Sequence, residues 1–237
     1  MAPPPTRATS SASTISGGSV RKKVKGDSVS FDSPGMSELV TFIIGPTKKK
    51  FLIHKRFACE ASPVLRTAFN GSFVEGQTQE YALADTTEDA FALLAQWVYA
   101  DRIEIDYESF AEDKNKDKAS TLQAKLMELW LLADRFLIPQ LQNIAISLLY
   151  ESQTKLNWFT LRSLNRVWEQ TSTDTKLRLF ILEFCIFWLN KQVFRVCGKW
   201  FPKEMLLELA YLTKQNTEDK VTEMAPIEGF YVPEESV

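Results

Sequence analysis

The sequence predicts an α+β domain, a small β-sheet flanked by a cluster of helices, followed by an all-α C-terminal extension. Two observations predict this order. Runs of β-branched and aromatic residues, typical of strands, fall between residues 40 and 105. Apolar residues at helical spacing recur within that region and continue to residue 212. With 237 residues, 45% of them hydrophobic, the chain can bury a sizeable core.

Residues 1–35 differ from the rest in composition. They are rich in Pro, Ser, Thr and Gly and contain almost no large apolar side chain, so burial cannot offset the entropy of ordering them. We predict a disordered basic tail there. Residues 1–34 have a net charge of +3, which leaves −5 for the remainder of a chain whose total is −2. This balance argues against general nucleic-acid binding, which needs a clear basic surplus.

The first strands and helices follow from residue 40. The run VTFII at residues 40–44 and the apolar residues 51–53 predict a hairpin whose turn is GPTKKK. A short helix is expected over residues 55–60. Ser62 and Pro63 then supply a capping hydroxyl and a proline at the first helical position, and Asn70-Gly71 ends that helix near Phe69.

A second strand-and-helix group follows. Residues 81–83 predict a short strand, and Thr86 with Asp89 resembles a capping box before helically spaced residues that continue to Val98. Residues 103–105 alternate like the end of a strand. Residues 106–119 are charged and nearly free of aliphatic side chains, which predicts a surface loop inside the domain.

Two helices are predicted to meet at a tight corner at Pro139. Five side chains on either side of it should be buried: Leu129, Ala133, Phe136, Leu141 and Ile144. The C-terminal extension, residues 153–213, should hold one helix from Trp158 to Trp168, a second over residues 177–189 and a last one after Pro202. The second of these is 13 residues long, short of the roughly 20 that cross a bilayer, so we predict a buried helix. Residues 214–237 form an acidic tail in which Phe230 and Tyr231 can dock locally.

Three stretches in this order resemble the BTB/POZ domain family. They are VTFIIG…KKKFLIHKRFACEASPVLRTAF (residues 40–69), AFALLAQWVYADRIEI (residues 90–105) and LWLLADRFLIPQLQNIA (residues 129–145). The resemblance places a BTB/POZ domain at residues 36–152. The positions that match the family's structural motif are His54, Lys55, Ser62, Phe69, Tyr99, Ala133, Asp134, Phe136, Pro139 and Leu141.

The resemblance implies a protein–protein interaction module without catalytic activity or cofactor. Family members self-associate, recruit transcriptional corepressors or serve as substrate adaptors of cullin-type ubiquitin ligases. A short BTB protein with a Ser/Pro-rich head and a helical tail also resembles proteins of filamentous fungi. We therefore expect an adaptor that docks partners through its BTB domain, with an oligomeric or transcription-linked scaffold as the alternative.

The segment Phe73-Val74-Glu75 is the candidate partner-binding site. In BTB adaptors, an apolar residue, any residue and Glu in the matching loop contact the N-terminal helices of a cullin. An exposed apolar anchor beside a charge suits such an interface. The alternative is a common tripeptide in which Phe73 packs back on its own domain.

Self-association is the other behaviour that the resemblance implies. Many dimeric members have an Asp directly before the first strand, whereas this sequence has Leu39 there and Glu38 one residue earlier. The preceding segment also lacks the helical pattern of the extra N-terminal helix in those dimers. Both departures argue against their swapped dimer, although a homo-oligomer of another kind is still expected.

Catalytic and metal sites are not indicated. His54 is the only histidine, and the resemblance implies a buried structural role for it. Cys59, Cys185 and Cys197 form no CxxC pair, so a zinc site is not predicted, and an odd number of cysteines suits a reducing intracellular compartment. No phosphate-binding glycine motif is present. We expect neither a small-molecule substrate nor a membrane partner.

A short basic cluster in the tail fits a nuclear-import signal, and a solvated charge run explains it equally well. The cluster is made of Arg21, Lys22, Lys23 and Lys25. The compartment is thus cytoplasmic, nuclear or both. The sequence does not identify the partner or the substrate.

Overall fold

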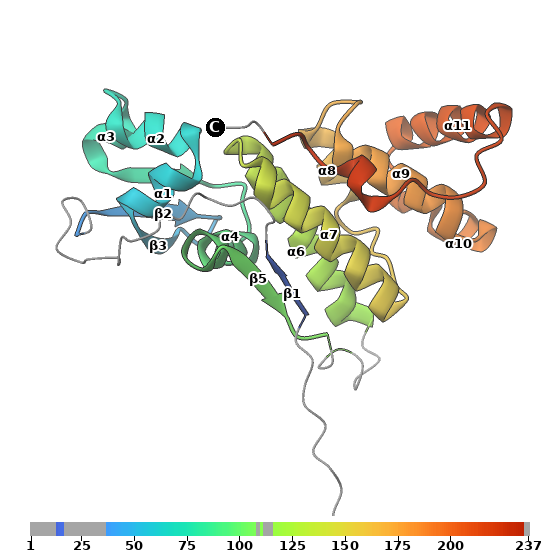
Figure 1. Ribbon diagram of the computed structural model, residues 1–237, viewed down its shortest axis with the longest axis horizontal. Coiled ribbons are helices and arrows are strands. Elements are labelled where there is room, and N and C mark those ends of the chain that lie inside the picture. The colour runs from blue at the N-terminus through green and yellow to red at the C-terminus, as the bar shows by residue number, and fades with distance from the viewer. Residues whose placement is uncertain (1–12, 17–36, 108–109, 111–115, 235–237) are drawn as a thin grey trace, which may run out of the picture.

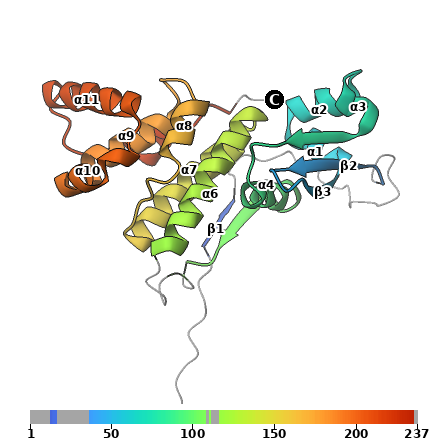
Figure 2. The same cartoon turned by 180° about the vertical axis from the view of Figure 1, so that it is seen from behind.

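The computed structural model describes residues 13–16, 37–107, 110 and 116–234 (Figure 1). A small sheet with short helices forms one end of the molecule, and helices α8 to α11 form the other. The long helices α6 and α7 lie between them, as the view from behind also shows (Figure 2). Apart from residues 13–16, the tail predicted to be disordered lies outside the described residues, and so do Arg21, Lys22, Lys23 and Lys25.

The main sheet has the strand order β3-β2-β4. Strands β2 (Leu39–Ile44) and β3 (Lys49–His54) form the predicted antiparallel hairpin, but the turn is shorter than expected because Lys49 and Lys50 belong to β3. Gly45 begins the turn at a φ of +68°, which a glycine adopts without strain. Strand β4 (Glu80–Leu83) pairs in parallel with β2. The side chains of β2 alternate between the two faces of the sheet, and those on the inner face, Val40, Phe42 and Ile44, are buried in the core.

Four helices pack around this sheet: α1 (Lys55–Ala61), α2 (Pro63–Asn70), α3 (Val74–Thr78) and α4 (Glu88–Ala100). All but α3 were predicted from the sequence. Ser62 caps α2 as predicted, because its hydroxyl accepts a hydrogen bond from the Leu65 amide. The predicted capping box at Thr86 and Asp89 is wrong: Thr87 caps α4 by accepting from the Ala90 amide, and Thr86 is buried instead.

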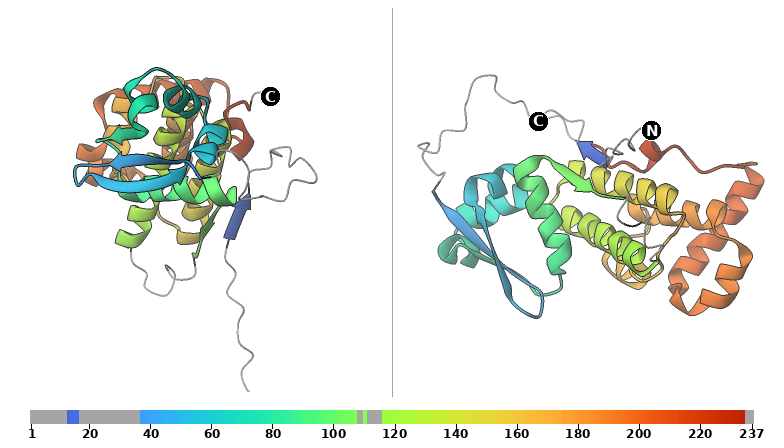
Figure 3. Two further views of the ribbon diagram at one scale, coloured as in Figure 1. Left: turned by 90° about the vertical axis from the view of Figure 1, so that its left-hand side faces the viewer. Right: turned by 90° about the horizontal axis from the view of Figure 1, so that it is seen from below.

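A second, two-stranded sheet joins β5 (Arg102–Ile105) to β1 (Ser13–Ser16). The strands are antiparallel, with Ser13 opposite Ile105 and Ser16 opposite Arg102. The sequence analysis predicted β5 but not β1. Figure 3 shows β1 beside β5, away from the main hairpin.

Helices α6 (Lys116–Arg135) and α7 (Pro139–Leu156) form the predicted antiparallel pair with its corner at Pro139. Leu129, Ala133, Phe136, Leu141 and Ile144 are all buried, as predicted. The loop predicted over residues 106–119 is too long, since α6 already begins at Lys116. Tyr107 is also buried rather than on the surface, and its hydroxyl donates to the Leu148 carbonyl.

The extension contains α8 (Leu164–Gln170), α9 (Lys176–Trp188), α10 (Lys191–Cys197), the 3-10 turn η1 (Gly198–Trp200) and α11 (Lys203–Glu218). The helix predicted from Trp158 to Trp168 is wrong in its first half. The side-chain amide of Gln123 donates to the Trp158 carbonyl and accepts from the Thr160 amide, and these bonds hold a segment without regular secondary structure. Helix α9 is the predicted buried helix, and among the described residues no helix is long and apolar enough to cross a membrane.

A buried arginine joins three of these elements. Arg178 on α9 donates to the carbonyls of Trp168 and Thr171 at the end of α8 and to the carboxylate of Glu208 on α11, 2.8 Å away. Its guanidinium also lies over the Trp168 ring. The last helical turn, η2 (Ile227–Phe230), returns to α7 and α9, and Phe230 is fully buried there, in line with the predicted local docking.

Candidate partner-docking site

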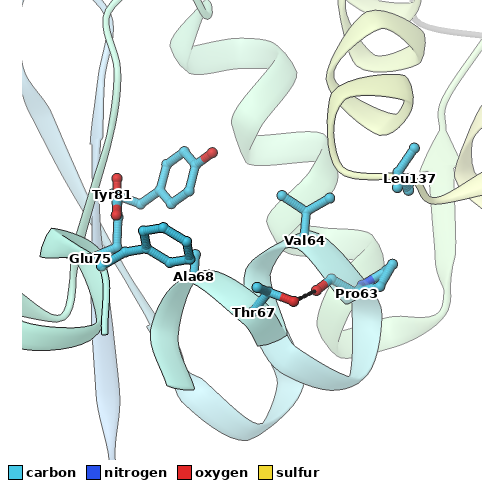
Figure 4. Close-up of a pocket in the computed structure, with 8 residues that line it drawn as sticks. Pro63, Val64, Thr67, Ala68, Glu75, Tyr81 and Leu137 are labelled. Carbon is cyan, nitrogen blue, oxygen red and sulfur yellow. Dashed lines mark hydrogen bonds between the residues drawn. The ribbon is translucent and has the colours of Figure 1, made fainter. Parts of the chain in front are cut away.

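An open hollow of about 430 Å³ lies on the outer side of α2 and α3, next to the corner between α6 and α7. We call it the α2–α3 hollow. In Figure 4, Val64 and Leu137 lie on one side of it, and Tyr81 and Glu75 lie on the other. Its lining residues come from four elements and are Pro63, Val64, Thr67, Ala68, Phe73, Glu75, Tyr81 and Leu137. The lining is mostly apolar, with a single carboxylate.

The segment predicted to bind a partner borders this hollow. Phe73 and Val74 are 59% and 69% exposed, so neither side chain packs into the domain core. Phe73 and Glu75 both line the hollow, whereas Val74 does not. Phe73 is thus exposed at the edge of the hollow rather than buried in the domain core. Glu75 is half-buried in the first turn of α3, where a carboxylate is favoured by the helix dipole.

Two glycines allow α3 to lie close to the end of α2. A Cβ atom added to Gly76 would lie 2.1 Å from the carbonyl oxygen of Gly71, and one added to Gly71 would lie 2.6 Å from the carbonyl oxygen of Thr67. Gln79 closes the turn with a φ of +55°, and its side-chain amide donates to the carbonyls of Phe69 and Gly76. The hydrogen bonds and the absence of two Cβ atoms fix where Phe73 and Glu75 lie.

The floor of the hollow rests on packed aromatic rings. Tyr81 has its ring centroid 6.2 Å from that of Phe69 and 5.7 Å from that of Phe136, both edge to face. Burial raises the pKa of the Tyr81 hydroxyl, and the nearby charge of Glu75 raises it further. Tyr81 therefore presents a neutral hydroxyl at neutral pH, and Glu75 supplies the only charge of the lining.

The corner between α6 and α7 supplies the remaining side of the hollow. Ser62 is fully buried, and its hydroxyl donates to the carbonyl of Phe136 at 2.6 Å while it caps α2. Leu137 follows with a φ of +52° and is 60% exposed, so the turn before Pro139 directs it outward. The spacing between α2 and Leu137 is thus set by one hydroxyl group.

His54 lies apart from the hollow, at the end of β3. The prediction that it is buried is wrong, since its ring is only half-buried at the edge of the sheet. Its Nδ1 is 2.9 Å from the hydroxyl of Tyr99, and its backbone amide donates to the same hydroxyl. The ring also packs edge to face on Phe57. These contacts give His54 a local structural role at the junction of β3 and α1.

The other motif residues are dispersed over the domain. Lys55 pairs with Glu38 at 3.5 Å, and Phe69, Ala133 and Leu141 are buried in the core. Asp134 accepts a hydrogen bond from the side chain of Gln142, and burial raises the pKa of its carboxyl group. None of the motif residues lines the hollow, but Phe69 and Phe136 pack against Tyr81, which does.

Sequence reasoning missed most of the lining. Val64, Ala68 and Tyr81 were not among the predicted binding residues, yet all three line the hollow. The available signal was Leu137, an apolar residue between a helix end and a proline, where a short turn leaves little room for burial.

Potential metal ligands do not cluster in the described part of the chain, where no group of three or more His, Cys, Asp or Glu could hold a metal ion. The three cysteines are free. Cys185 is fully enclosed by apolar neighbours, and burial raises the pKa of its thiol to about 12. Such a thiol stays protonated at neutral pH and is a poor nucleophile.

Comparison with known proteins adds one match. A family model described as BTB/POZ domain matches residues 36–153. This range holds the main sheet, the α2–α3 hollow, α6 and all but the last three residues of α7. A search of curated proteins found no match.

Proposed function

Because residues 36–153 belong to the BTB/POZ domain family, a family of protein–protein interaction modules, we propose that this protein is an adaptor that docks a partner in the α2–α3 hollow. The observation that carries the proposal is the position of Phe73: a large apolar side chain, 59% exposed, at the rim of an apolar hollow. Exposed aromatic anchors beside such depressions are typical of binding hot spots.

The chemistry of the hollow suits a helix with apolar side chains and a basic group. Val64, Tyr81 and Leu137 offer apolar surface from three elements, and Glu75 offers one negative charge at the edge. A charge at the rim contributes orientation more than affinity. The N-terminal helices of a cullin-type scaffold are the partner that we propose, since the adaptors of that family use a matching apolar-x-Glu segment.

The C-terminal extension provides a second exposed face. On α10, η1 and α11, Val196, Trp200, Leu207 and Tyr211 are all exposed. This face lies at the end of the molecule opposite the sheet (Figure 1), so a substrate held there would not compete with a scaffold at the hollow.

Copurification of the intact protein with a cullin-type scaffold tests the proposal. Phe73→Ala and Glu75→Ala should each reduce the bound scaffold, Phe73→Ala by roughly tenfold or more because it removes the apolar anchor. Leu52→Ala is the matched control, since Leu52 is 62% exposed on β3, outside the lining of the hollow. Circular dichroism should show that all three variants remain folded.

If the wild-type protein retained no cullin-type scaffold at micromolar concentration, the proposed ligase role would be wrong. Equal losses for Phe73→Ala and Leu52→Ala would instead remove the hollow as the docking surface. In both cases the family assignment would stand.

A second candidate function, an oligomeric scaffold, is favoured by the pairing of β1 with β5. Four residues of β1 pair with four residues of β5, and a second copy of the chain that donated β1 in the same register would form a strand-exchanged dimer. Leu39 and the absence of a predicted N-terminal helix argue against the swapped dimer of other family members, so this exchange would differ from theirs. Light scattering of the full chain separates the two candidates. A stable dimer that is unaffected by Phe73→Ala and Glu75→Ala supports the scaffold, whereas a monomer argues against it.

A further inference from the structure

The last described residues cross the molecule after α11 and end against α7 (Figures 1 and 3). We call residues 224–234 the C-terminal strap. Apart from the single turn η2, the strap has no regular secondary structure and pairs with no strand. It contacts α9 in the extension and α7 in the BTB/POZ domain, and we call the surface of these two helices that it covers the α7–α9 groove.

Asn143 on α7 recognises the backbone of the strap. Its side-chain oxygen accepts from the Val232 amide at 2.7 Å, and its side-chain nitrogen donates to the Val232 carbonyl at 3.0 Å. The same nitrogen is 3.1 Å from a carboxylate oxygen of Glu234. Asn143 is 8% exposed, so this amide is built into the groove and directed at an extended peptide.

Side chains on both helices recognise the residues before Val232. Phe230 is fully buried and meets the Phe180 ring edge to face, with 5.5 Å between the centroids. The hydroxyl of Tyr231 lies 2.7 Å from that of Ser147. Together with the bonds of Asn143, these contacts fit a peptide with the sequence Phe-Tyr-Val and an acidic residue two positions after the Val.

Two further contacts hold the beginning of the strap to α9. The Lys176 ammonium donates to the Gly229 carbonyl at 2.8 Å, and a Glu183 carboxylate oxygen accepts from the Ala225 amide at 2.8 Å. Both involve main-chain groups of the strap, so they do not depend on its side chains. The connecting residues 219–223 are all exposed.

We propose that the α7–α9 groove is a peptide-binding site for extended segments of the pattern Phe-Tyr-Val-x-Glu, which the C-terminal strap occupies and closes in the free protein. Phe230 is the only fully buried residue of the strap, and the others that pack on the core are only partly buried, so the strap opens more readily than the helices beneath it. A partner segment of the same chemistry competes with the strap for Asn143 and the Phe230 position. This site shares no residue with the α2–α3 hollow, so it does not depend on the adaptor proposal.

Fluorescence anisotropy with a labelled peptide of residues 222–234 tests the proposal on the full-length protein. Phe230→Ala in the protein frees the groove, so it should bind the peptide roughly tenfold or more tightly than wild type, in which most molecules are closed. The double variant Phe230→Ala, Asn143→Ala should lose that gain. Leu52→Ala is the matched control, because Leu52 is 62% exposed on β3, and it should behave as wild type.

Several outcomes would overturn the proposal. They are a folded Phe230→Ala protein that does not bind the peptide, wild type that binds as tightly as Phe230→Ala, or binding that survives Asn143→Ala. Wild type that self-associates, with dimers lost in Phe230→Ala, would show that the strap exchanges between two copies rather than closing its own groove.

Hydrogen exchange keeps the test decisive if Phe230→Ala fails to fold. Excess unlabelled peptide added to wild type should accelerate amide exchange at Tyr231 and Val232, because it displaces the strap. Amides of α9 should not change. Unchanged exchange at Val232 under saturating peptide contradicts a displaceable strap.

Discussion

Replacement of Arg178 by methionine should destabilise the C-terminal extension more than any surface change of equal size. Arg178 is 6% exposed, and methionine of similar length would fill its volume without donating a hydrogen bond. The carbonyls of Trp168 and Thr171 would lose their donor, and the Glu208 carboxylate, with a side chain 17% exposed, would lose its partner. Removal of one member of a buried ion pair costs about 3–5 kcal/mol.

The remaining exposure of Glu208 sets the size of the effect. Water can reach part of its carboxylate, so we expect the lower end of that range, about 3 kcal/mol. The exposed pair Lys214 and Glu218, which lies on α11 together with Glu208, provides the control. Their side chains are 72% and 64% exposed, and Lys214→Met should therefore cost less than about 1 kcal/mol.

Urea unfolding followed by tryptophan fluorescence measures both variants, with Trp168 beside Arg178 as a local reporter. The double variant Arg178→Met, Glu208→Gln should recover part of the loss, because no charge is left without its partner. If Arg178→Met cost no more than Lys214→Met, or if the double variant were less stable than the additive sum, the buried pair would not have the role described.

Two further predictions concern the BTB/POZ domain. Gly76→Ala should displace α3 and weaken partner binding at the α2–α3 hollow by roughly tenfold, because its Cβ would collide with the Gly71 carbonyl. The control is Gly198→Ala, whose Cβ would meet no atom within 4 Å and which should leave binding unchanged. Equal binding by both variants would contradict this account. Asp85→Asn should reduce stability at neutral pH and not at acidic pH. The hydrogen bond from Arg135 holds the pKa of Asp85 below its usual 3.8, so its contribution is present above that pH and is lost as the pH falls through the lower folded-state pKa. Both side chains are more than a third exposed, so the difference should stay below about 1 kcal/mol, and thermal unfolding of both proteins from pH 7 to pH 2 measures it.

The elements with strong local patterns could be predicted from the sequence. Helix α9 is apolar on nearly every side, and the corner at Pro139 lies between two regular apolar stripes, so burial and secondary structure agree at both places. Phe73 could be identified as exposed from its resemblance to an adaptor loop. The half-buried position of His54 could not be predicted, because its hydrogen-bond partner Tyr99 is 45 residues away in the sequence.

Segments that side-chain amides hold could not be predicted in this way. Gln123 holds residues 158–160 outside any helix although Trp158 and Leu161 fit a helical stripe, and Asn143 holds the C-terminal strap by the same kind of bonds. Strand β1 is another such case, since its partner is β5, far away in the sequence. In all three, long-range hydrogen bonds override or replace the local pattern.

The buried hydroxyl of Ser62 has a consequence for the thermodynamics of association. Since it ties the start of α2 to the turn that bears Leu137, the recess between them is preorganised, and its walls need no rearrangement before a ligand arrives. The conformational entropy lost on complex formation is then mainly that of the incoming helix. Stiffening that helix, by a lactam bridge for example, should improve affinity more than any rigidifying substitution in this protein.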